Sequence, residues 1–139
     1  MSTIQVDIIS VAGQVFSGPA EMVFCPAEQG EVGIAPRHAP LITRLRAGEV
    51  RVQSGGEEQQ FFVNGGLLEV QPHAVTVLTD LAVRAKDLDE AAALEAKQRA
   101  EQLLSERKGD VDIAMAQAEL VEASARLQML QRIRRRGGS

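Results

Sequence analysis

The first part of the chain, up to about Arg84, carries short runs in which apolar and polar residues alternate. In the first run Ile4, Val6 and Ile8 alternate with polar neighbours. Because successive side chains of a strand point to opposite faces, each run predicts a strand with one buried face. Strands are predicted over residues 3–9, 21–25, 48–54, 59–64, 67–70 and 74–80.

Turn-forming residues separate these runs at short intervals. The predicted turns are Ser17-Gly18-Pro19, Gly55-Gly56, Asn64-Gly65-Gly66 and Pro72-His73. Short strands with closely spaced turns are typical of an antiparallel β-sandwich or barrel. The segment "GEVGIAPRHAPLITRL" (30–45) holds glycines, prolines and a histidine, and is predicted to form a rigid surface loop.

From Asp87 onward the apolar period changes to that of a helix. Asp87 and Glu90 have the spacing of a capping box, so a helix is predicted to begin there. Arg107 and Lys108 suit its last turn and Gly109 its end. One face carries an apolar stripe of Ala93, Ala96, Ala100, Leu103 and Leu104.

A second helix is predicted to follow, with Asp110 as its cap. Its heptad-like stripe consists of Ile113, Ala116, Leu120, Ala123, Leu127 and Leu130. A short connection predicts that the two helices form an antiparallel hairpin. Alanine buries little area, so the hairpin is expected to be only modestly stable. The predicted domains are a β-sandwich over 1–86 and an α-helical hairpin over 87–139.

The composition of the chain excludes several classes of function but does not identify one. The net charge of −4 argues against general nucleic-acid binding. A single cysteine excludes an internal disulfide and fits a reducing compartment. The N-terminus does not resemble a signal peptide, and no run has the ~20 apolar residues of a membrane helix, so no direct membrane insertion is expected.

The chain offers few groups for chemistry. The soft metal ligands are widely spaced and predict no metal site: Cys25, His38 and His73. No phosphate-binding loop or nucleophile elbow is present. Asp87, Asp89 and Glu90 are interpreted as helix-start acids. The sequence therefore predicts no catalytic residue, no cofactor and no enzyme.

The strongest charge feature is the run of arginines near the C-terminus: Arg132, Arg134, Arg135 and Arg136. One interpretation is a solvated tail that complements the dipole of the last helix. The other is an electrostatic contact for an acidic partner. A nucleic-acid contact lacks the interleaved aromatic residues that would support stacking.

An ordered set of motifs resembles the epsilon subunit family of bacterial F-type ATP synthases. The matching segments cover nearly the whole chain: "FSGPAEMV" (16–23), "GEVGIAPRHAPLIT" (30–43), "NGGLLEVQP" (64–72), "VTVLTDLAVRAKDLDEAAALEAKQRAE" (75–101) and "GDVDIAMAQAEL" (109–120). The resemblance implies a non-catalytic rotor subunit on the cytoplasmic face of the bacterial inner membrane, peripheral and part of F1.

The resemblance also implies partners. The sandwich would bind the gamma subunit near His38 and the c-ring near Glu31. The helices would inhibit ATP hydrolysis by extending into the alpha/beta subunits, where the arginine tail would meet acidic segments. Folded down, they would permit catalysis.

Some members of the family bind ATP at the hairpin through an Ile or Leu followed by Asp-x-x-Arg-Ala. Here residues 88–93 read "LDEAAA", so Ala92 stands in place of the arginine. The flanking family positions hold Val83, Glu122 and Arg126. Only Asp89, Ala93 and Arg126 match, so very weak or no ATP binding is expected. An ATP-sensing regulatory module remains the alternative function, and a nucleic-acid adaptor a third.

Overall fold

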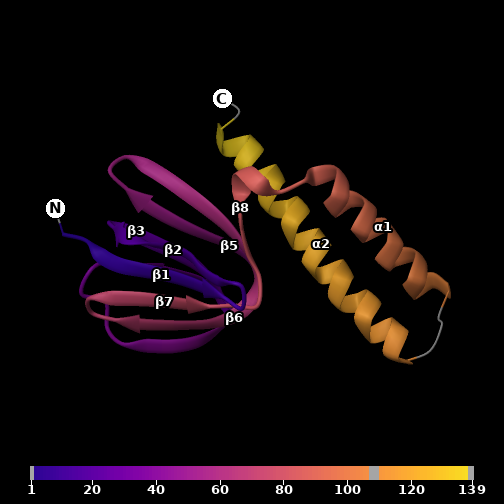
Figure 1. Ribbon diagram of the computed structural model, residues 1–139, viewed down its shortest axis with the longest axis horizontal. Coiled ribbons are helices and arrows are strands. Elements are labelled where there is room, and N and C mark those ends of the chain that lie inside the picture. The colour runs from indigo at the N-terminus through magenta and orange to yellow at the C-terminus, as the bar shows by residue number, and fades with distance from the viewer. Residues whose placement is uncertain (1, 107–109, 138–139) are drawn as a thin grey trace. The chain divides into compact units, whose positions relative to one another are not determined.

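The computed structural model describes residues 2–106 and 110–137, which form two compact units, residues 1–86 and 87–139 (Figure 1). The regular elements of the first unit are strands as far as Arg84. They are β1 (Ile4–Ser10), β2 (Gly13–Ala20), β3 (Met22–Ala27), β4 (Gly30–Ile34), β5 (Leu41–Ser54), β6 (Glu57–Gln71), β7 (Ala74–Leu78) and β8 (Ala82–Arg84).

The strands form one sheet that folds over on itself into a sandwich. Their order is β2-β1-β7-β6-β5-β3-β4, and β8 pairs with β6. All pairs are antiparallel except β1 with β7, which run parallel. The prediction of an antiparallel sandwich is therefore correct apart from this one pair. β1 and β7 are far apart in sequence, so no hairpin turn forces them to run in opposite directions.

The predicted turn at Asn64-Gly65-Gly66 is wrong, because β6 continues through these residues without ending. The part of β6 before the glycines pairs with β8, and the part after them pairs with β7. Gly65 and Gly66 have φ of 121° and 133°. A Cβ on Gly66 would lie 2.1 Å from the carbonyl oxygen of Leu78, so the glycine is needed where the strand bends.

The predicted turn at Ser17-Gly18-Pro19 is also wrong, since these residues lie inside β2. β2 is at one end of the strand order, where a proline lacking its N–H costs no ladder hydrogen bond. The other turn predictions are confirmed. Gly55 and Gly56, with φ of 61° and 81°, connect β5 to β6.

The segment 30–45 is a loop only in its middle. Its first part is strand β4 and its last part begins β5, so the prediction of a loop throughout is wrong. β4 pairs with β3, and its glycines had hidden the strand pattern. The prolines of the segment, Pro36 and Pro40, lie in the connection between β4 and β5, where a loop was predicted.

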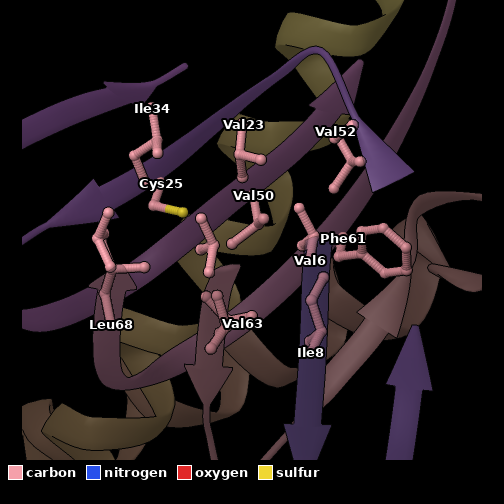
Figure 2. Packing of buried hydrophobic residues seen from close by; sticks show 14 of the residues in the cluster. Val6, Ile8, Val23, Cys25, Ile34, Val50, Val52, Phe61, Val63 and Leu68 are labelled. Carbon is pink, nitrogen blue, oxygen red and sulfur yellow. The ribbon is translucent and has the colours of Figure 1, made fainter. Parts of the chain in front are cut away.

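The core of the sandwich is formed by inward-facing residues of both layers. Figure 2 shows Val6 and Ile8 of β1 directed toward residues of β3, β5 and β6, with Val50, Phe61 and Leu68 among them. All of these side chains are fully buried. The rings of Phe16 and Phe61 lie 5.5 Å apart between β2 and β6. Alternation thus predicts the buried residues of β1 correctly, whereas Phe61, Phe62 and Val63 of β6 are buried in succession.

The second unit is a helical hairpin, and the short 3-10 helix η1 (Ala85–Asp87) spans the boundary between the two units. Its helices are α1 (Glu90–Glu106) and α2 (Asp110–Gly137), which pack side by side and run in opposite directions (Figure 1). The predicted fold class, a β-sandwich followed by two helices in contact, is confirmed. Arg107, Lys108 and Gly109, which were predicted to end the first helix, lie outside the described residues.

The predicted helical stripes are confirmed in part, since about half of their residues are buried and most of the others are half-buried. Ala93, Ala100, Ala116, Ala123 and Leu127 are buried. Leu103 is an exception, with 37% of its surface exposed. The predicted capping box is wrong: the N–H of Ala92 donates to Oδ1 of Asp89 at 3.1 Å, so Asp89 caps α1, while Asp87 belongs to η1.

Candidate binding surfaces

The residues considered for chemistry do not converge in the structure. Cys25 is fully buried in the core, and burial, followed by the charge of Glu31, raises the pKa of its thiol to about 12. A thiol in this state is a poor nucleophile and a poor metal ligand. In the part of the chain that the structure describes, no group of three metal-ligating side chains is found.

The loop between β4 and β5 presents His38 on a backbone held by hydrogen bonds. The N–H of Arg37 donates to the carbonyl of Pro72 at 2.8 Å, which ties this loop to the turn between β6 and β7. Arg37 has a φ of 68°. His38 is half-buried, and its Nδ1 lies 2.7 Å from the carbonyl oxygen of Ala39. The loop is therefore a shaped surface rather than a flexible connection.

Glu31 lies on β4, away from the contacts of His38, and is held by an arginine of β5. Nη2 of Arg51 is 3.1 Å from Oε1 of Glu31. The Glu31 side chain is 50% exposed and Arg51 only 18%. The same guanidinium lies 3.8 Å from Glu49 and 3.6 Å from Glu58. The structure thus places Glu31 in a charged cluster that it does not share with His38.

The sequence interpretation missed Arg51 and its support. The guanidinium of Arg51 stacks over the ring of Phe24, 4.3 Å from its centroid. The signal was present in the alternation of residues 48–54, because Arg51 stands between the buried Val50 and Val52 and must face outward. Only the pairing of β3 with β5 brings Phe24 beside it.

The hairpin contains a groove of about 390 Å³ between its two helices. Two of the three matches to the family's ATP motif line it, Ala93 and Arg126. The third, Asp89, uses its carboxylate to cap α1. The groove is lined by Ala93, Ala96, Arg99, Leu103, Glu119, Glu122, Ala123 and Arg126. Arg99 and Glu119 were missed by the sequence interpretation, although they face the groove at helical spacing.

The groove lining holds charges of both signs. Nη2 of Arg126 is 3.0 Å from Oε1 of Glu122, so a carboxylate already occupies a hydrogen-bonding edge of this arginine. Glu119 adds a further negative charge to the lining. Ala92, at the family's arginine position, has no side-chain donor. The two glutamates of the lining are balanced by two arginines, Arg99 and Arg126, so the groove offers no net positive charge to a phosphate.

The arginines of the C-terminal run are not equivalent. Arg132 and Arg135 are exposed. Arg134 forms an ion pair with Glu90, which links the last turns of α2 to the start of α1. The side chain of Arg136 lies outside the described residues. Glu90, predicted as part of a capping box, thus serves as a partner for Arg134.

No helix within the described residues is long and apolar enough to cross a membrane. Two family models match the chain. "ATP synthase, Delta/Epsilon chain, beta-sandwich domain" matches residues 3–85, and "ATP synthase, Delta/Epsilon chain, long alpha-helix domain" matches residues 86–131. The ATP synthase epsilon chains of Halorhodospira halophila and Nitrosococcus oceani are 61% and 62% identical to it. Each match covers 98% of this chain and 98% of the relative.

Solved structures share the fold at low identity. A chain from the OSCP/F1/c-ring assembly of Euglena gracilis mitochondrial ATP synthase has a TM-score of 0.82 and 19% identity, and the match covers 92% of this chain and 81% of that one. A chain from the central stalk/c-ring of Tetrahymena thermophila mitochondrial ATP synthase has a TM-score of 0.60 and 10% identity, with 95% and 96% coverage. Both family models, the relatives and the fold agree with the resemblance seen in the sequence, and the chain therefore belongs to the epsilon chain family of ATP synthase, as a non-catalytic subunit.

Proposed function

We propose that the chain is a central-stalk rotor subunit that couples rotation of the gamma subunit and c-ring to ATP synthesis and inhibits ATP hydrolysis through its C-terminal helices. The observation that carries this proposal is the division of the chain after Lys86 into two internally packed units. One unit can stay bound while the other changes its contacts. The proposed location is the cytoplasmic face of the bacterial inner membrane, peripheral and within F1.

The sandwich is the proposed fixed part. Its shaped loop presents His38 toward gamma, and the loop's tie to Pro72 keeps that surface in place. Glu31, half exposed and oriented by Arg51, is the proposed contact with the polar loops of the c-ring. His38→Ala is then a change at an interface: assembly or coupling weakens, and the chemistry of hydrolysis is unaffected.

The hairpin is the proposed inhibitory part. Its buried residues are mainly alanines, so few kcal/mol separate its packed state from alternatives. Arg132 and Arg135 are exposed and suit acidic segments of the alpha/beta subunits. Arg134 would first have to leave Glu90 if the helices separate. Arg136 belongs to the same proposed contact by its position in the sequence.

The test is the assembled complex with the chain truncated before Asp87. ATP hydrolysis is expected to rise while ATP-driven proton pumping is retained. A full-length variant with Arg132, Arg134 and Arg135 changed to Gln separates the tail charges from the helices themselves. Unchanged hydrolysis in the truncated complex would overturn the inhibitory part. Failure of the full chain to co-purify with gamma would overturn the assembly part.

An ATP-sensing module is the second candidate, because the groove occupies the place of the family's ATP motif. The Glu122–Arg126 pair and Ala92 argue against it. Titration calorimetry of the isolated chain with ATP is expected to show no binding in the micromolar range. Micromolar affinity would favour this second function over the first.

A further inference from the structure

We propose that Arg51 is the positioning residue for Glu31, so that the c-ring contact depends on a side chain that faces Glu31 from another strand. The inference rests on the proposed contact between Glu31 and the c-ring. It adds an interface determinant on β5, twenty residues along the chain from the carboxylate that it orients.

The position of Arg51 is built across three neighbouring strands. Phe24 of β3 pairs in register with Arg51 of β5 on one side and with Gly33 of β4 on the other. A Cβ on Gly33 would lie 3.2 Å from Cε1 of Phe24, tighter than an ordinary van der Waals contact. Gly33 therefore leaves space for the ring, and the ring supports the guanidinium 4.3 Å from its centroid.

Neighbouring carboxylates also hold the guanidinium of Arg51 in place. Glu49 and Glu58 lie 3.8 and 3.6 Å from it, so carboxylates attract it from several directions. Glu58 also accepts hydrogen bonds from Gln53 at 2.8 Å and Gln60 at 3.1 Å. With its stem largely buried, Arg51 has little rotamer freedom left to lose when it binds Glu31.

Glu31 receives its orientation from this fixed group. Oε1 of Glu31 accepts the hydrogen bond from Nη2 of Arg51, while half of the Glu31 side chain stays exposed. Without the cation, Glu31 would share this surface with Glu49 and Glu58, and like charges would push the exposed carboxylate into solvent. Loss of Arg51 should therefore have the same consequence for a partner as loss of the Glu31 charge.

The test measures the affinity of F1, reconstituted with each variant, for membranes that hold the c-ring and have been stripped of F1. Glu31→Gln and Arg51→Met are each expected to raise the dissociation constant about three- to tenfold. The double variant is expected to match either single one. Arg51→Lys keeps a cation near Glu31 and should recover most of the lost affinity. Arg46→Met, an equal loss of charge from an exposed position of the same strand, is the control and should change nothing.

The outcomes separate the two proposals. No effect of Glu31→Gln overturns the proposed ring contact. An effect of Glu31→Gln without one of Arg51→Met, an additive double variant, or no recovery by Arg51→Lys overturns the positioning role. Binding of gamma reports whether each variant folds. If Arg51→Met loses gamma binding, Gly33→Ala replaces it, because it shifts only the Phe24 ring beneath the guanidinium. If F1 with Gly33→Ala then bound the c-ring membranes with unchanged affinity, the inference would be overturned.

Discussion

The two units of this chain reach burial by different means. The sandwich fully buries large side chains such as Phe61, Ile4 and Leu68 in one continuous core. The buried residues of the hairpin are mainly alanines, together with Leu127 and Met129, and a groove of about 390 Å³ lies between its helices. At about 25 cal/mol per Å² of apolar area, the same number of buried residues stabilises the hairpin far less. Among the described residues, the two units therefore differ both in the size of their buried side chains and in how many they bury.

Polar contacts follow the same division. In the sandwich, Oγ1 of the buried Thr79 donates to the carbonyl oxygen of Gly65 at 2.6 Å, and the N–H of Leu81 donates to Oδ1 of Asn64 at 3.1 Å. These bonds lock the bend of β6 to the chain after β7. The hairpin relies on the Asp89 cap and on exposed or half-exposed ion pairs, which contribute about 0–1 kcal/mol each.

The largest expected effect is in the sandwich core. Phe61→Ala should lower the free energy of unfolding by about 3–5 kcal/mol, because it opens a cavity where Phe16 and the layers now meet. Urea unfolding followed by circular dichroism measures it. Ile42→Ala, at a position 72% exposed, is the control and should stay within about 0.5 kcal/mol. Equal losses in both variants would contradict the assigned core.

A smaller effect is expected in the hairpin, and it should stay there. Leu127→Ala should destabilise the helices by about 2 kcal/mol, since Leu127 is the largest buried residue of the predicted stripe. Amide hydrogen exchange resolves the two units. Faster exchange in α1 and α2 with unchanged protection of the strands is the expected result. Val121→Ala, 61% exposed on the same helix, is the control. Uniform loss of protection over both units would contradict their independence.

The buried thiol makes the sandwich sensitive to alkaline pH. The pKa of Cys25 is raised from 9.0 to about 12 in the folded chain. The folded state therefore keeps the proton where the unfolded state loses it, and stability falls as pH rises from 9 to 12. The slope attributable to Cys25 is about 1.4 kcal/mol per pH unit. Comparing wild type with Cys25→Ala in urea unfolding at several pH values isolates it. Parallel pH curves would exclude this account.

The smallest expected effect concerns the start of α1. Asp89→Ala should cost about 1 kcal/mol through loss of the bond from the N–H of Ala92. Asp89→Asn keeps an acceptor and should cost less. Asp87→Ala tests the capping box that the sequence suggested, and should have little effect because Asp87 lies in η1. Thermal unfolding of the helical signal measures all three. A larger loss from Asp87→Ala than from Asp89→Ala would restore the original interpretation.

The candidate surfaces were predictable only in part. The segment holding Glu31 and His38 could be selected from its glycines, prolines and family resemblance, and both side chains are solvent-accessible there. The contacts that hold these two residues in place could not be predicted from the sequence. Arg51 reaches Glu31 through strand pairing, and Arg37 reaches Pro72 through a loop contact, and neither follows from local sequence. The pairing of Glu122 with Arg126 is different, because residues four apart on one helix are neighbours and their spacing can be found in the sequence.

By itself, the sequence determined the alternation that makes strands, the change of period near Asp87, the small residues of the helical stripes and the family. These properties depend on neighbours a few residues apart, where geometry is nearly fixed. Only the tertiary structure decided that β6 continues through Gly65 and Gly66, that β1 pairs with β7 in parallel, and that Arg51 stacks on Phe24 beneath Glu31. Those outcomes depend on which strands become neighbours, and that choice is made by packing of the whole core.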